Sequence, residues 1–136
     1  MVNDNKGPLT ADQRVEKALA LRKEGYNCAQ CVMMAFDDLH GLSADMSARI
    51  SAALGGGVAG QGEICGAASV MSMLAGYESF GAPADKPATY SRVRTLCGEF
   101  TGRNGSMVCR ELKARKRPCP ELIEDAIRIL HKSLDN

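Results

Sequence analysis

The stretch NCAQCVMMAFDDL, residues 27–39, decides the fold expected for this chain. Asn27 is a good helix N-cap. The apolar side chains that follow recur at spacings of three and four residues: Cys28, Cys31, Val32, Ala35, Phe36 and Leu39. That period predicts one amphipathic helix, whose buried stripe carries two cysteines near its N-terminal end.

The same period recurs along most of the chain. It predicts further helices over residues 10–24, 43–54, 64–80, 88–100, 107–116 and 120–134, and it places Met46 and Ile50 of the helix at 43–54 on the inward face. Thr10 to Gln13 reads as a capping box, Ser43 and Ser106 are N-caps, and Pro120 suits the first turn of the last helix. No stretch shows sustained alternation rich in β-branched residues. The expectation is an all-α fold, a single compact domain of five to seven helices over residues 10–136, after a flexible tail at 1–9.

Composition narrows the classes of function. The 136 residues are 45% hydrophobic and 24% charged, with a formal net charge of +1. This balance gives no reason to expect a nucleic-acid partner. No apolar run approaches the roughly 18 residues of a membrane span, and the first residues lack a signal-peptide core, so we expect no membrane insertion and a cytoplasmic protein. Six cysteines in that reducing compartment favour metal binding or catalysis over structural disulfides.

Four of the six cysteines share one position. Cys28, Cys65, Cys109 and Cys119 each lie at or just before the start of an expected helix. Unpaired N–H groups and the positive end of the helix dipole lower a thiol's pKa there and favour the thiolate. Thiolate both attacks disulfides and binds metals. We therefore expect the four cysteines to meet in one redox or metal site.

The glycine-rich run GGGVAGQGE, residues 55–63, forbids regular structure and lets the backbone approach a neighbour closely. We expect Gly56, Gly57, Gly62 and the following Gly66 to line the site, where loop amides could hydrogen-bond a bound group. The run lacks the spacing of a phosphate-binding loop. Cys97, in the middle of an expected helix, reads as a packed apolar residue, and Cys31 as either a spare thiol or a packed one.

These motifs resemble a known family. NCAQ at Asn27–Gln30, the glycine-rich loop, CGA at residues 65–67, CREL at residues 109–112 and the late Cys119 are similar to the C-GCAxxG-C-C family of redox-active proteins. The family motif has glycine where this chain has Val70, a departure that concerns helix packing. A similar module occurs in split-Soret cytochromes, beside haem-binding sequence that this chain lacks. There the resemblance implies an iron–sulfur cluster.

Three chemistries use the same four cysteines. An iron–sulfur cluster for electron transfer ranks first, because four thiolates are its usual ligands. A thiol–disulfide oxidoreductase, with Cys28 attacking and a second cysteine resolving, ranks next. A structural zinc site in a helical adaptor is the third. A fourth hypothesis involves no redox chemistry: the chain is a helical interaction protein whose cysteines are passive core residues. The redox hypotheses imply a redox partner protein, which the sequence does not identify. The sequence is also compatible with a homodimer.

Cys28 is expected to be more reactive than Cys31. Cys28 directly follows the Asn27 cap and lies closest to the free amides and the dipole. Cys31 lies one turn further into the helix, where both effects fade.

Overall fold

Helices form nearly all the regular structure of the computed structural model, which describes residues 8–134. Its elements are α1 (Ala11–Lys23), α2 (Cys28–Ala35), α3 (Asp37–His40), α4 (Ala44–Ser51), α5 (Gly66–Ser79), α6 (Lys86–Asn104), α7 (Cys109–Ala114) and α8 (Cys119–Ser133), with short 3-10 turns at Ala52–Leu54 and Pro83–Asp85. The described residues contain no strand, only an isolated bridge between Ile64 and Val108. The all-α, single-domain prediction is confirmed. Most of the tail expected at residues 1–9 lies outside the described residues.

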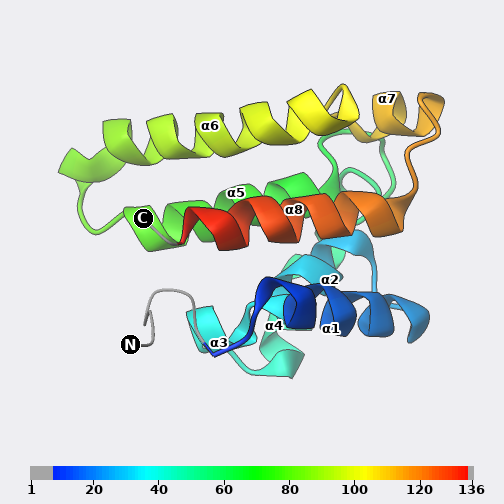
Figure 1. Cartoon of the computed structure of the whole chain (residues 1–136), viewed down its shortest axis with the longest axis horizontal. Coiled ribbons are helices and arrows are strands. Elements are labelled where there is room, and N and C mark those ends of the chain that lie inside the picture. The colour runs from blue at the N-terminus through cyan, green and yellow to red at the C-terminus, as the bar shows by residue number, and fades with distance from the viewer. Residues whose placement is uncertain (1–7, 135–136) are drawn as a thin grey trace.

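α5 is the helix around which the others pack. It contacts α2, α6 and α8, while α1 packs on α2 and α8. In Figure 1, α5 and α8 cross the middle of the molecule, α6 lies along one side, and α1, α2 and α4 lie on the other. Small residues make this central position possible, because Gly66, Ala67, Ala68 and Ala75 are fully buried or nearly so and let neighbouring backbones approach.

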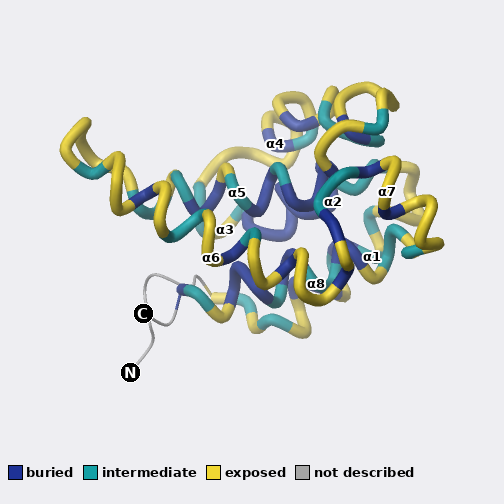
Figure 2. The backbone as a smooth tube through the Cα atoms, turned by 90° about the horizontal axis from the view of Figure 1, so that it is seen from above, coloured by how far each residue is buried: buried dark blue, intermediate teal, exposed yellow. Residues whose placement is uncertain are grey.

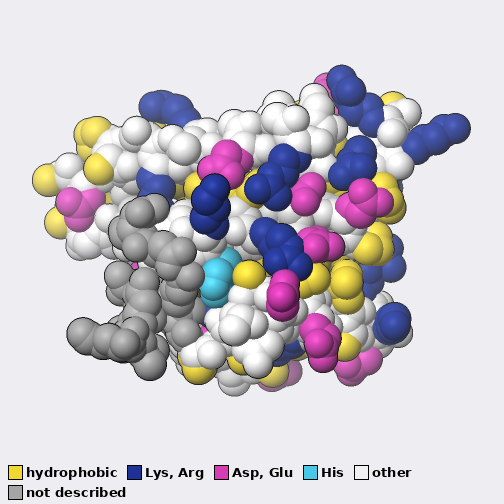
Figure 3. All heavy atoms as spheres, viewed as in Figure 1, with side chains coloured by type: hydrophobic (Ala, Val, Ile, Leu, Met, Phe, Trp, Pro, Cys, Tyr) yellow, Lys and Arg dark blue, Asp and Glu magenta, His cyan; other side chains and the backbone are white. Residues whose placement is uncertain are grey.

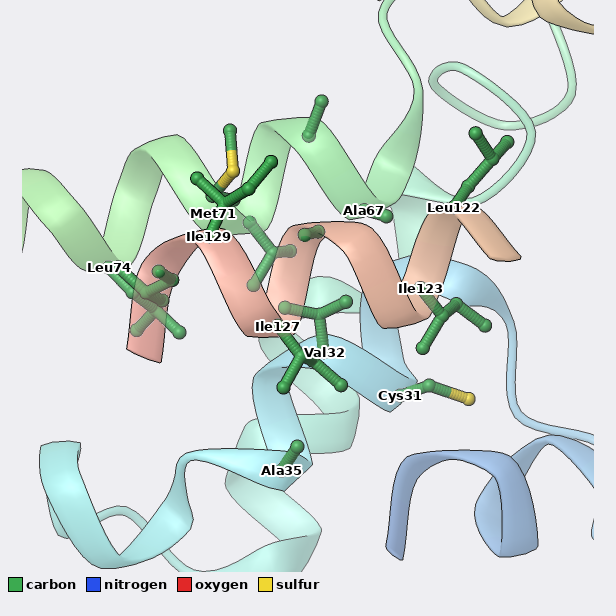
Figure 4. Close-up of a cluster of buried hydrophobic side chains, with 14 of the residues drawn as sticks. Cys31, Val32, Ala35, Ala67, Met71, Leu74, Leu122, Ile123, Ile127 and Ile129 are labelled. Carbon is green, nitrogen blue, oxygen red and sulfur yellow. The ribbon is translucent and has the colours of Figure 1, made fainter. Parts of the chain in front are cut away.

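The core is aliphatic. Side chains from α2, α5 and α8 meet in Figure 4, among them Val32, Ala35, Ala67, Met71, Leu74, Ile123, Ile127 and Ile129. Figure 2 shows the buried backbone concentrated in α2, α5 and the inner face of α8. Burial of this apolar surface, at roughly 25 cal/mol per Å², is the main force that fixes the helices against one another.

The expected helix over residues 27–39 is two helices in the structure. The backbone of Phe36 leaves helical geometry, with φ −116° and ψ 22°, and separates α2 from α3. The fully buried Arg14 of α1 stabilises this break. Its guanidinium donates to the Ala35 carbonyl at 2.7 Å and to the Asp38 carboxylate at 2.7 Å, and stacks on the Phe36 ring at 4.4 Å. The break raises the number of α-helices in the described residues to eight, one above the expected range.

Two smaller expectations were wrong. α6 continues past Phe100 to Asn104 and ends at Gly105, whose φ of 88° is the left-handed C-cap that glycine favours. Met46 and Ile50 were expected to face inward. They are 43% and 49% exposed, because the face of α4 that packs on the core carries Ser47 and Ser51 instead.

Charges of both signs are interspersed on the face drawn in Figure 3. Ion pairs also join helices: Arg128 of α8 reaches Asp12 of α1 at 2.9 Å, and Arg103 of α6 lies 3.6 Å from Asp125 of α8. None of the helices among residues 8–134 combines the length and apolar character that crossing a bilayer requires.

Arg14 provides a test of the fold. Arg14→Met keeps most of the side-chain volume but removes the buried cation beside Asp38. We expect the free energy of unfolding to fall by about 3 kcal/mol, because one partner of a buried ion pair is left behind. Urea unfolding measures this. The matched control is Arg49→Met, since Arg49 is 74% exposed and its ion-pair partner among residues 8–134 is the exposed Asp45. That change should stay within about 0.5 kcal/mol. Equal losses in the two variants would contradict the role given to Arg14.

Candidate functional site

Four cysteines occupy helix starts, as the sequence predicts. Cys28, Cys109 and Cys119 are the first residues of α2, α7 and α8, and Cys65 is the N-cap of α5. These four helix starts lie toward the same end of the molecule in Figure 1. Each cysteine is a free thiol.

Backbone pairing holds Cys65 and Cys109 beside each other. The Cys65 N–H donates to the Met107 carbonyl at 2.7 Å, and the Cys109 N–H donates to the Glu63 carbonyl at 2.6 Å. These two bonds flank the bridge between Ile64 and Val108. The start of α5 is thereby joined to the start of α7, across more than 40 residues of sequence.

Asn27 fixes the start of α2. Its side chain accepts from the Gln30 N–H at 2.9 Å, and the Gln30 side chain accepts from the Asn27 N–H at 3.0 Å, which completes a capping box. Asn27 also donates to the Ala52 carbonyl at 2.9 Å, just before the glycine-rich loop. The first turn of α2, and with it Cys28, is therefore tied to the loop.

The glycine-rich loop folds back on itself in left-handed geometry. Gly56, Gly57, Gly60 and Gly62 have positive φ, and so do Val58 at 63° and Ala59 at 52°. For a β-branched residue such as Val58 this is an uncommon and costly conformation. The Gly62 and Glu63 N–H groups donate to the Gly56 and Gly57 carbonyls at 3.0 Å and hold the loop closed.

Cys28 and Cys65 form a hydrogen-bonded thiol pair. The Cys65 thiol donates to the Cys28 sulfur, and this bond lowers the pKa of Cys28 to about 6. Burial opposes the shift, while the backbone N–H groups of Gly56, Ala67 and Ala29 add to it. The same hydrogen bond, together with burial, raises the pKa of Cys65.

Solvent access separates the two members of the pair. Cys65 is 3% exposed, whereas Cys28 is half-buried. Amides from its own helix, from α5 and from the loop converge on the Cys28 sulfur. They stabilise negative charge there, so the thiolate of the pair is Cys28 and not Cys65. The pair thus consists of an accessible thiolate backed by a buried thiol.

Gly66 makes this approach possible. A Cβ atom at position 66 would lie 2.9 Å from the Cys28 sulfur, 2.8 Å from the Leu54 carbonyl oxygen and 3.0 Å from the Ala29 Cβ. Only glycine therefore lets the first turns of α2 and α5 touch. Of the glycines expected to line the site, Gly56 provides an amide to Cys28. Gly57 and Gly62 instead fit closely against Glu63 and Arg110.

Cys109 and Cys119 lie near the pair. Burial raises the pKa of Cys109; nearby Lys113 partly offsets this, and the charges of Cys28 and Cys119 add to it. Cys119 lines the same surface cavity as Cys28 and Gly56. Among residues 8–134, however, no three His, Cys, Asp or Glu side chains are arranged to hold a metal ion. The four cysteines in this arrangement form a close thiol pair, Cys28 and Cys65, with Cys109 and Cys119 as neighbours.

The other two cysteines have different surroundings. Cys31 is fully buried, and its thiol lies 3.7 Å from the Tyr26 carbonyl. Burial, and then the Cys28 charge, raise the pKa of Cys31 to about 11. These directions agree with the expectation that Cys28 is the more reactive of the two. Cys97 lies 3.3 Å from the Ser72 hydroxyl, where α6 packs on α5, and is only partly buried.

A family model described as "Putative redox-active protein (C_GCAxxG_C_C)" matches residues 26–133. This chain belongs to the C_GCAxxG_C_C family. The match includes all four helix-start cysteines, and membership supports the redox-active character that they indicate. Val70, which departs from the family motif, is fully buried in the core. Comparison with curated proteins and with solved structures gave no match.

Gly66 provides a test of the site in this C_GCAxxG_C_C protein. Gly66→Ala should lower the free energy of unfolding by about 1–3 kcal/mol, because the added methyl forces α2 and α5 apart. It should also slow alkylation of Cys28 by iodoacetamide. The control is Gly98→Ala in α6, where a Cβ would meet nothing within 4 Å. That variant should gain up to about 1 kcal/mol, as alanine favours a helix, and keep the wild-type alkylation rate. A stable Gly66→Ala protein with unchanged Cys28 reactivity would contradict the geometry.

Proposed function

We propose that this protein exchanges a dithiol for a disulfide, with Cys28 as the attacking thiolate and Cys65 as the resolving thiol. The observation that supports this best is the hydrogen bond between the two thiols, which lowers the pKa of the accessible one and raises that of the buried one. Near neutral pH, the resting pair then holds one proton between two sulfurs. Low pKa and access are the properties of an attacking cysteine.

The chemistry proceeds in two exchanges. The Cys28 thiolate attacks one sulfur of a substrate disulfide, forms a mixed disulfide and releases the other half as a thiolate, which takes a proton from solvent. Cys65 then attacks the Cys28 sulfur, and its proton passes through solvent to the departing thiolate of the substrate. This step forms the Cys28–Cys65 disulfide and releases the second half of the substrate. Two electrons pass from the pair to the substrate, and a dithiol reductant restores the pair.

The protein environment assists each step. The amides of Gly56, Ala67 and Ala29 stabilise negative charge on Cys28 before the attack. Cys65 lies within hydrogen-bonding reach of Cys28, so the second exchange needs little movement of the backbone. Because Cys65 is buried, an external disulfide does not reach it, and Cys28 is therefore the thiol that attacks the substrate first.

An iron–sulfur cluster held by Cys28, Cys65, Cys109 and Cys119 is the second candidate. The gathering of four helix-start cysteines at one end favours it, since such clusters take four thiolates. Against it, the described residues present no preformed set of three or more metal ligands. A visible absorption spectrum with iron and sulfide analysis, on protein purified without oxygen, separates the two candidates. Stoichiometric iron and sulfide would favour the cluster, and their absence the dithiol.

The pH dependence of alkylation tests the hydrogen-bonded pair. Only the thiolate reacts, so the rate at Cys28 should rise with pH through a midpoint near 6 and level off above it. In Cys65→Ala the main cause of the low pKa is gone, and the midpoint should move toward the ordinary thiol value of about 8.5. Iodoacetamide labelling located by peptide mass spectrometry measures both. Cys97→Ala serves as the control and should keep the wild-type midpoint. An unchanged midpoint in Cys65→Ala would contradict the claim that the hydrogen bond from Cys65 lowers the pKa of Cys28.

Trapping the intermediate tests the order of the two exchanges. With hydroxyethyl disulfide, the wild-type protein should form an internal Cys28–Cys65 disulfide. Cys65→Ser should stop at a mixed disulfide on Cys28, and Cys28→Ser should form neither product. Cys31→Ser should behave as wild type, because Cys31 is buried and its pKa is raised to about 11. Intact mass and peptide mapping distinguish these products. A mixed disulfide found on Cys109 or Cys119 in place of Cys28 would assign the attack to another cysteine.

A further inference from the structure

A cavity of about 310 Å³ opens over Cys28. Besides Cys28, it is lined by Arg22 from the last turn of α1, by Gly25, Tyr26 and Asn27 between α1 and α2, and by Gly56 and Cys119. This volume is at the low end of the range for small-molecule sites. Cys28 is the low-pKa thiol in the cavity, so whatever enters the cavity meets the sulfur proposed to attack.

Among the described residues that line the cavity, Arg22 is the only Lys, Arg, Asp or Glu. Most other arginines of residues 8–134 are already paired with carboxylates: Arg14, Arg49, Arg103, Arg110, Arg117 and Arg128. No such ion pair is formed by Arg22 within those residues. Its charge acts on the first turn of α2, because it lowers the pKa of Cys31 against the larger effects of burial and the Cys28 charge. The cavity therefore offers a free cation beside a thiolate.

We propose that the disulfide reduced by Cys28 is a small molecule with a carboxylate close to its S–S bond, and that Arg22 binds this carboxylate. The inference rests on the dithiol function proposed above. An anion would otherwise be repelled by the Cys28 thiolate, and a guanidinium in the same cavity offsets that repulsion. The cavity volume of about 310 Å³ leaves room for a short aliphatic chain, whereas a folded protein would have to bring a single loop into the cavity.

Three small disulfides of different charge test this: dithiodiglycolate, which is anionic, hydroxyethyl disulfide, which is neutral, and cystamine, which is cationic. For each compound, the rate of mixed-disulfide formation at Cys28 is measured in Cys65→Ser protein. That rate is then divided by the rate at which the same compound reacts with free mercaptoethanol, which corrects for differences in intrinsic reactivity between the compounds. We expect the normalised rates to fall from the anion to the neutral compound to the cation. Added salt should reduce the preference for the anion.

Arg22→Gln should lower the ratio of anionic to neutral rates about three- to ten-fold. This ratio is unaffected by any change in the pKa of Cys28, because both compounds meet the same thiolate. Arg49→Gln, at an exposed arginine of α4, is the matched control and should leave the ratio unchanged. A loss confined to Arg22→Gln would support binding of the carboxylate.

The outcomes separate the two proposals. If none of the three compounds reacts at Cys28, the dithiol function fails. If all three react, but their normalised rates depend neither on the charge of the compound nor on Arg22, the dithiol function stands and the proposal of an anionic substrate is wrong. Faster reduction of the disulfides of insulin, a protein substrate, than of dithiodiglycolate would likewise overturn the small-molecule inference and leave the function intact.

Discussion

The close contact between the first turns of α2 and α5 is the constraint on which the rest of the structure depends. Gly66 lets the Cys28 sulfur lie against the α5 backbone, at a distance that any Cβ would forbid. The amides of two helix starts and of Gly56 then point at one sulfur. Helix N-termini stabilise negative charge because their N–H groups have no partner within the helix. The geometry of packing and the chemistry of the thiol are therefore a single feature of this fold.

Other parts of the fold preserve this contact. The capping box of Asn27 fixes where α2 begins, and the bond from Asn27 to Ala52 ties that point to the glycine-rich loop. The paired backbone around Ile64 and Val108 fixes where α5 begins. At the opposite end of α2, Arg14 holds the break at Phe36 in place. α2 is thus fixed at both ends, and its first residue has little freedom to leave α5.

The two thiols of the pair have unequal environments for negative charge. A proton shared between two sulfurs settles on the one with the poorer environment for charge, here the buried Cys65. The accessible Cys28 is left as the thiolate. Cys31 shares the helix of Cys28 and lies only one turn away, yet burial raises its pKa to about 11. Three positions along one helix separate a half-buried thiol whose pKa is lowered from a fully buried thiol whose pKa is raised.

The sequence by itself determined the all-α class, nearly every helix start and the placement of four cysteines at those starts, since these depend on local capping and on the 3.6-residue period. It could not determine which cysteines touch. Cys28 and Cys65 meet because Gly66 permits a close approach, and Cys65 and Cys109 are held together by backbone bonds that no side-chain pattern encodes. The break at Phe36 was also missed, because its cause, the buried Arg14, comes from another helix. Local signals fix where helices begin, whereas only tertiary packing decides which of those beginnings lie together.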